Sequence, residues 1–167
     1  DYMRKITFSG KQLLSLINDI LELSRLENQG NKLQNSQFNI QTCVEDAASI
    51  FRGQAQSEQK EFEVSFDIQH SVVLGDPQKL TQILNNLISN AFKYSESGAE
   101  IRVRVREFDF QQYNKYQIVV EDTGIGMSQA FREHLFEPYS RETQFSRHST
   151  TGTGLGMPIV KSLVQQM

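Results

Sequence analysis

Two asparagines and a lysine stand at helical spacing near the middle of the sequence. Asn86, Asn90 and Lys93 are separated by four and three positions, so on a helix they share one face, while Leu84 and Ile88 fall on another. A carboxamide oxygen is a hard ligand that suits Mg²⁺, and a lysine one turn later can meet a phosphate as a point charge. Taken alone, the cluster is better explained as the solvated polar face of a helix.

A second cluster occupies residues 122–127, with the sequence Asp-Thr-Gly-Ile-Gly-Met, directly after an expected strand. Paired glycines let the backbone approach a flat ligand closely. The carboxylate of Asp122 can accept a hydrogen bond from an exocyclic amine such as that of adenine. A strand-to-helix turn capped by Asp122 explains the same residues, so this motif alone is weak evidence.

A third cluster occupies residues 152–158, with the sequence Gly-Thr-Gly-Leu-Gly-Met-Pro, and leads into the last expected helix. Backbone N–H groups of a glycine-rich turn at a helix N-terminus form an anion site. The spacing is not GxGxxG and no strand directly precedes it, which argues against a dinucleotide-binding βαβ unit. The sequence also lacks GxxxxGK[ST], which excludes the usual P-loop.

Mixed helices and strands must position these clusters. Asp76 and Pro77 are typical of an N-cap and a first helical turn, and Thr42 with Glu45 has the spacing of a capping box. Hydrophobic periodicity predicts strands at residues 38–40, 62–68, 72–74, 101–108 and 116–121, and helices at residues 44–55, 76–94 and from about 155 to the end.

A long helix over residues 3–28 precedes this part of the chain. Its apolar residues cover most of its circumference, so it must pack against other helices, either of its own chain or of a partner. A polar, glycine-bearing break at residues 28–31 follows. We therefore expect two domains, residues 1–30 and residues 31–167.

Composition excludes several classes of protein. The net charge of −3 argues against nucleic-acid binding. Arg102, Arg104 and Arg106 alternate, which is typical of the solvated side of a strand. A single cysteine, Cys43, allows no internal disulfide and suits the reducing cytosol. No apolar run of about 20 residues is present to span a bilayer.

Together and in this order, the clusters resemble the Bergerat-fold superfamily, and within it the sensor histidine kinases. Residues 80–94 resemble the N box, 122–127 the first glycine box, 135–141 the F box and 152–157 the second glycine box; residues 16–27 resemble the second helix of the dimerisation hairpin. The resemblance covers nearly the whole chain. It implies an α+β fold, a two-layer α/β sandwich preceded by one helix of a dimerisation domain.

The resemblance also implies Mg²⁺ and ATP as ligands. By similarity Asn90 coordinates the Mg²⁺ that bridges the phosphates, Asn86 supports the phosphate region, and Asp122 holds the adenine amine. A lid over residues 128–151 would cover the triphosphate, and Arg141 is the candidate for reaching the γ-phosphate. The residues implied around the nucleotide are Asn86, Asn90, Lys93, Tyr94, Asp122, Gly124, Gly126, Met127, Gly152, Thr153, Gly154, Leu155, Gly156 and Met157.

One position separates kinase from hydrolase within this superfamily. Hydrolytic relatives place a glutamate four residues before the metal-binding asparagine, where this chain has Asn86, and a neutral amide cannot take the proton of an attacking water. We therefore expect transfer to a histidine upstream of Asp1. We interpret His70, His134 and His148 as surface residues, so this fragment should bind ATP without phosphorylating itself.

The resemblance carries expectations about partners as well. It implies a homodimer through the N-terminal helix, a response-regulator receiver domain as acceptor, a cytoplasmic location, no nucleic acid, and contact with a membrane only through parts of a parent protein. The family usually adds two more strands after the last helix, which this sequence lacks. A nucleotide-sensing module and a hydrolase stay open as alternatives to the kinase.

Overall fold

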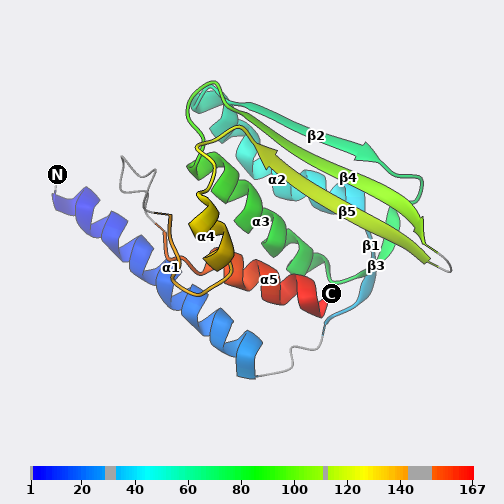
Figure 1. Ribbon diagram of the computed structural model, residues 1–167, viewed down its shortest axis with the longest axis horizontal. Helices are drawn as coiled ribbons and strands as arrows, with labels where there is room; N and C mark the ends of the chain where they lie inside the picture. The colour runs from blue at the N-terminus through cyan, green and yellow to red at the C-terminus, as the bar shows by residue number, and fades with distance from the viewer. Residues whose placement is uncertain (1, 29–32, 111–112, 143–151) are drawn as a thin grey trace. The chain divides into compact units, whose positions relative to one another are not determined.

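The computed structural model describes residues 2–28, 33–110, 113–142 and 152–167 (Figure 1). The chain divides into two compact units: residues 33–127 with Met167, and residues 1–32 with residues 128–166. The larger unit carries all the described strands and two long helices. The expected domain boundary at residue 30 stays a prediction.

Two sheets form in the larger unit. β2 (Glu61–Asp67), β4 (Glu100–Phe110) and β5 (Tyr113–Asp122) are neighbours in that order, with β2 parallel and β5 antiparallel to β4. β1 (Ser36–Asn39) and β3 (Val72–Gly75) pair antiparallel with each other. A parallel pair needs a long crossover, and the chain between β2 and β4 supplies it.

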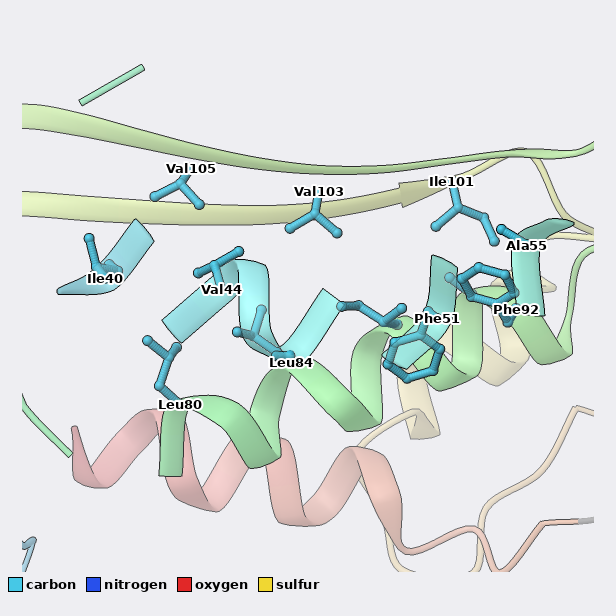
Figure 2. Close-up of a cluster of buried hydrophobic side chains, with 13 residues drawn as sticks. Ile40, Val44, Phe51, Ala55, Leu80, Leu84, Phe92, Ile101, Val103 and Val105 are labelled. Atoms are coloured by element: carbon cyan, nitrogen blue, oxygen red, sulfur yellow. The ribbon is translucent and has the colours of Figure 1, made fainter. Parts of the chain in front are cut away.

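The helices α2 (Ile40–Ser57) and α3 (Pro77–Lys93) cover one face of the three-stranded sheet (Figure 1). Figure 2 shows Ile101, Val103 and Val105 of β4 pointing toward these helices, and all three are 0% exposed. Their period of two matches the pleat of a strand with one buried face. The fold is therefore the expected α+β sandwich.

Phe92 anchors the last turn of α3 in this core. Its ring stacks on Phe51 at 5.5 Å between centroids and meets Phe62 edge-on at 5.4 Å. Aromatic pairs in these geometries add about 0.5–1.5 kcal/mol beyond their burial. The end of α3 is thus held from both the helix and the strand side.

The other side of β4 carries the alternating arginines. Arg102 forms an ion pair with Glu100 and Arg104 forms one with Glu121. Both arginines are partly exposed, so these pairs contribute little to stability. The prediction of a solvated strand side is confirmed.

The start of α2 differs from the expectation. The N-cap is Asn39, whose side chain accepts from the Thr42 N–H at 3.0 Å, so the prediction of Thr42 as cap was wrong. The helix begins at Ile40 instead of residue 44, and β1 ends one residue earlier than predicted. Ile40 N–H donates to the Ser71 carbonyl at 2.8 Å, and this long-range contact gives Ile40 a partner outside strand pairing.

Asp76 caps α3 as predicted. Its Oδ1 accepts from the N–H groups of Gln78 and Lys79, both at 3.1 Å, and its Oδ2 accepts from the N–H of Gln34 at 3.0 Å. Burial raises the pKa of this carboxyl, but the backbone donors together outweigh burial and hold the pKa below its ordinary value. Asp76 therefore fixes the beginning of the helix that carries the first cluster.

The hairpin of β4 and β5 is longer than predicted. β4 reaches Phe110 and β5 begins at Tyr113, whereas the predicted strands ended at residue 108 and began at residue 116. Residues 111 and 112 lie outside the described part. Phe110 and Tyr113 pack ring against ring at 5.3 Å, and this cross-strand contact extends the pairing toward the turn.

The smaller unit contains α1 (Tyr2–Asn28), α4 (Gln129–His134) and α5 (Gly156–Gln166). The predicted helices over residues 3–28 and from about residue 155 are confirmed, and α1 and α5 lie in contact. The expected break at residues 28–31 falls mostly outside the described residues. No described helix combines the length and apolar character needed to cross a membrane.

Candidate functional site

The first cluster lies on the second half of α3. Asn86, Asn90 and Lys93 are all half-buried, as expected for a helix face that is partly covered. Lys93 Nζ donates to the Tyr94 hydroxyl at 2.9 Å and lies 4.6 Å from the centre of that ring. The ammonium group is therefore held at the C-terminal end of the helix, where Tyr94 is the C-cap.

The second cluster docks on the same end of α3. The N–H of Ile125 donates to the Tyr94 carbonyl at 3.0 Å. The N–H of Gly124 donates to Asp122 Oδ1 at 2.9 Å, and Thr123 pairs with Glu100 through two hydrogen bonds of 2.9 and 3.0 Å. The carboxylate of Asp122 is exposed and fixed in direction by its bond to Gly124.

Gly124 is required by the closeness of this docking. A Cβ at this position would lie 2.4 Å from the Tyr94 carbonyl oxygen and 2.9 Å from Ser95 Oγ, so any larger residue must push the turn away from α3. Gly126 has a φ of +70°, a left-handed conformation that glycine adopts without penalty. The two glycines thus shape the turn for different reasons.

The third cluster belongs to the smaller unit, together with the F box. The N–H of Tyr139 donates to the Gly154 carbonyl at 3.0 Å. Gly154 has a φ of +72°, and a Cβ there would meet the Tyr139 backbone at 2.8 Å. Tyr139 itself has a φ of +64°, which is uncommon for a bulky residue. The F box and the second glycine box therefore form one packed unit.

Thr153 links the second glycine box to the N-terminal helix. Its hydroxyl donates to Asp19 Oδ2 at 2.8 Å and accepts from the N–H of Leu155 at 3.2 Å. Leu155 is 0% exposed and directly precedes α5, which begins at Gly156 and has Met157 in its first turn. Gly152 is exposed.

The expected lid contains one described helix and one part outside the described residues. Ser128 caps α4 by accepting from the Phe131 N–H at 3.1 Å, and its own N–H donates to Glu142 at 2.8 Å. Arg141 is the last residue of the F box. Residues 143–151 of the expected lid, with His148 among them, lie outside the described residues.

The other two histidines are engaged with carboxylates. His134 contacts Glu137 at 2.9 Å, and this hydrogen bond raises the pKa of the imidazole. His70 Nδ1 contacts Glu107 at 2.6 Å. Both imidazoles are more than half exposed, in agreement with their interpretation as surface residues.

Sequence reasoning missed two groups that shape the larger unit. Glu107 accepts from the backbone N–H groups of Gln69 and His70, and also from Asn114. Lys60 donates to the carbonyl of Phe92. The backbone partners of Glu107 and Lys60 lie more than 30 residues away in the sequence, and no local motif marks either residue.

The first two clusters are therefore adjacent within the larger unit, and the third is packed on the F box in the smaller unit. The convergence of all three on one nucleotide stays a prediction. Asn90 offers a hard oxygen ligand, Lys93 a positive charge and Asp122 a carboxylate, a set that suits a magnesium-bound nucleotide.

A family model described as "Histidine kinase-, DNA gyrase B-, and HSP90-like ATPase" matches residues 75–167, more than half of the chain. The sensor protein GacS of Pseudomonas syringae pv. syringae is 36% identical over 169 residues, which cover 100% of this chain and 18% of that protein. The autoinducer 2 sensor kinase/phosphatase LuxQ of Vibrio vulnificus is 33% identical over 165 residues, covering 95% and 19%. The chain thus spans about one fifth of these relatives.

Solved structures agree with the sequence relatives. Full-length ShkA in complex with AMPPNP superposes with a TM-score of 0.84 at 28% identity, covering 99% of this chain and 33% of that one. The histidine kinase AdeS of Acinetobacter baumannii, at 23% identity and a TM-score of 0.75 over 99% of this chain and 73% of that one, shows the same fold. The chain therefore belongs to the histidine kinase-, gyrase B- and HSP90-like ATPase family, as the ATP-binding catalytic domain of a sensor histidine kinase.

Proposed function

We propose that this domain binds magnesium-ATP and directs its γ-phosphoryl group to a histidine on another segment of the parent protein, for relay to an aspartate of a response regulator. The observation that carries the proposal is the docking of the turn at residues 122–126 on the end of α3. This docking holds the Asp122 turn against the C-terminal end of the helix that carries the amide and lysine cluster, which supports a single ligand for both.

The metal would be held chiefly by the nucleotide. The described residues hold no group of three or more His, Cys, Asp or Glu side chains suited to an ion. Mg²⁺ commonly keeps several waters and takes other ligands from substrate phosphates, so a single carboxamide oxygen from Asn90 suffices. Asn86, one turn earlier on the same face, would support the phosphate region.

The remaining contacts divide between base and phosphates. Asp122, with one oxygen held by the Gly124 N–H, keeps its other oxygen for the adenine amine, and Gly126 and Met127 border it. Lys93 and Tyr94 lie at the phosphate end of α3. Other phosphate contacts come from Arg141 and from the second glycine box, whose members are Gly152, Thr153, Gly154, Leu155, Gly156 and Met157.

The chemical step needs positioning more than covalent work. An imidazole nitrogen attacks the γ-phosphorus, the bond from that phosphorus to the β,γ-bridging oxygen breaks, and ADP departs with the bonding electron pair. The attacking imidazole loses its proton to solvent or to a base in the parent protein. Lys93 and Arg141 would offset the charge on the phosphoryl oxygens, and a magnesium ion held by Asn90 would supply further positive charge there.

Asn86 favours transfer over hydrolysis. A neutral carboxamide cannot accept the proton of a water molecule, so water attack lacks a base at this position. Slow phosphate release from ATP by the chain is the expected consequence. Steady-state release at a rate typical of an ATPase would support the hydrolase alternative instead.

The relatives and α1 support the proposed partners. Tyr2, Met3, Ile6, Leu13 and Leu14 on α1 are 59–84% exposed, an apolar surface that a second copy of the helix would cover in a homodimer. ThkA was solved in complex with the response regulator TrrA, and this chain shares its fold with a TM-score of 0.66 at 22% identity. We place the domain in the cytoplasm of its cell.

Asn90→Ala tests the site. Calorimetric titration with AMPPNP, with and without magnesium, should show a loss of about 10–100-fold in magnesium-dependent affinity, a range typical of lost metal-site support. Ser89→Ala is the matched control, because Ser89 is the exposed neighbour on the same helix. Undiminished affinity and metal dependence in Asn90→Ala would show that the site is misassigned.

Phosphotransfer is tested separately on a longer piece of the parent protein. A piece that includes the upstream helix should acquire acid-labile phosphate from labelled ATP, while the 167-residue chain should not. Labelling of the short chain would mean that His70, His134 or His148 accepts the phosphoryl group. A chain that binds nucleotide, and whose longer form stays unlabelled, would favour the nucleotide-sensing alternative.

A further inference from the structure

A buried lysine lies at the turn between α2 and β2. Lys60 Nζ donates to the carbonyl oxygen of Phe92 and to Glu58 Oε2, both at 2.6 Å. The Lys60 side chain is only 5% exposed, whereas that of Glu58 is 38% exposed. The ammonium also lies 5.5 Å from the centre of the Phe92 ring, so its contacts lie at the last turn of α3.

The chemistry of a helix end explains why a cation is held there. The last carbonyls of a helix have no intrahelical partner, and they carry a partial negative charge. Phe92 is 2% exposed, so water has little access to its surroundings. Burying a lysine is costly unless it is paired, and here both a carboxylate and a helix-end carbonyl satisfy it.

The turn that holds Lys60 is itself fixed to the loop that follows α3. The N–H of Gly98 donates to the Gln59 carbonyl at 2.8 Å, and the N–H of Glu61 donates to the Ala99 carbonyl at 2.9 Å. Lys60 thus approaches the end of α3 from a braced segment.

The last turn of α3 also contains residues of the candidate site. Phe92 lies between Asn90 and Lys93 in the chain. Two residues after Phe92, the Tyr94 carbonyl accepts a hydrogen bond from the N–H of Ile125. Gly124 abuts that carbonyl so closely that even a methyl group is excluded. Displacing the Phe92 carbonyl therefore moves Lys93 and Tyr94, and with them the turn of Asp122.

We propose that Lys60 is a positioning residue for the nucleotide site, because its ammonium holds the last turn of α3 in the place that both clusters require. The inference rests on the proposed function for its effect on the nucleotide. It assigns Lys60 no contact with the ligand. Its role is to hold the main chain at the Phe92 carbonyl.

The test compares Lys60→Met with Val44→Ala in the 167-residue chain. Methionine keeps an apolar side chain against Phe92 but removes the charge and the donor. Val44 is a 0% exposed core residue of α2, so its truncation destabilises the fold without removing a contact at Phe92. Denaturant unfolding of both variants gives the loss of stability against which each binding result is judged.

Two measurements follow at a temperature where every variant is folded. Magnesium-AMPPNP affinity should fall about ten-fold in Lys60→Met. This loss is smaller than the roughly 100-fold that misplacement by about 1 Å can cost. In Val44→Ala the affinity should stay near the wild-type value. Hydrogen exchange of the Ile125 amide should accelerate in Lys60→Met more than in Val44→Ala. Lys60→Arg, which keeps a charged donor, should restore most of the nucleotide affinity and most of the protection of the Ile125 amide from exchange.

The outcomes separate the two proposals. If the wild-type chain fails to bind the nucleotide, the proposed function fails, while the Ile125 exchange rates still decide the role of Lys60. If Lys60→Met and Val44→Ala agree in affinity and in exchange, Lys60 is only a stabilising residue and the inference is wrong. If Lys60→Met does not fold, Lys60→Gln takes its place in the same comparison, because the shorter glutamine side chain is polar but also lacks the positive charge.

Discussion

Replacing Gly124 by alanine should damage the nucleotide site with little effect on the rest of the domain. The added Cβ would lie 2.4 Å from the Tyr94 carbonyl oxygen, 2.7 Å from Asp122 Oδ1 and 2.9 Å from Ser95 Oγ. The first of these atoms belongs to the backbone at the end of α3 and cannot rotate away. The φ of Gly124 is not in the left-handed region, so alanine meets a steric conflict and no added backbone strain.

The size of the effect follows from the required displacement. Ordinary van der Waals contact begins near 3.4 Å, so the turn and α3 must separate by about 1 Å. A displacement of that size breaks or lengthens the 3.0 Å bond from Ile125 to Tyr94 and moves the Asp122 carboxylate. A misplacement of about 1 Å can cost about 100-fold in a positioned reaction, and we expect a loss of 10- to 100-fold in nucleotide affinity.

Titration calorimetry with magnesium-AMPPNP measures this loss, and thermal unfolding of the same samples shows whether the fold survives. Gly53→Ala is the control, because a Cβ at Gly53 meets nothing within 4 Å and alanine in a helix interior is favoured by about 0.5–1 kcal/mol. The reasoning is refuted if Gly124→Ala binds nucleotide like the wild type. Equal losses of affinity in both variants would also refute it.

Two further predictions concern the stability of the larger unit. Asp76→Ala should lower the free energy of unfolding by about 1–3 kcal/mol, through the lost helix cap and the unpaired N–H of Gln34; urea titration checks this, and Asp76→Asn, which keeps a capping oxygen, should lose less. Glu107 has a pKa lowered to about 2, chiefly by the His70 backbone N–H. Because a lowered folded pKa stabilises only the ionised form, the stability that Glu107 contributes should be complete above about pH 4.5 and disappear as the pH falls through about 2. The free energy of unfolding should differ between the wild type and Glu107→Gln at neutral pH, and this difference should disappear in acid. A difference that does not depend on pH would contradict the assignment.

Local patterns were sufficient to predict the elements. The alternation at Ile101, Val103 and Val105 predicted a strand with one buried face, and Asp76 with Pro77 predicted the start of α3, because these signals depend on neighbours within a few residues. The glycine and amide motifs likewise identified the candidate site residues and the family. The N-cap of α2 was missed because Asn39 and Thr42 both suit a cap, and the contact of Ile40 with Ser71 lies outside any local window.

The pairing of the strands and the contacts at the end of α3 depended on the tertiary structure. The sequence alone determined which segments are helices and strands and which residues could hold a magnesium nucleotide. Only the fold decided that β2 runs parallel to β4, that Gly124 abuts the Tyr94 carbonyl, and that Lys60 reaches the end of α3. The physical reason is that helix and strand preferences arise from interactions between near neighbours, whereas these contacts join residues about 30 or more positions apart and form only when the sheet and both helices bury their shared core.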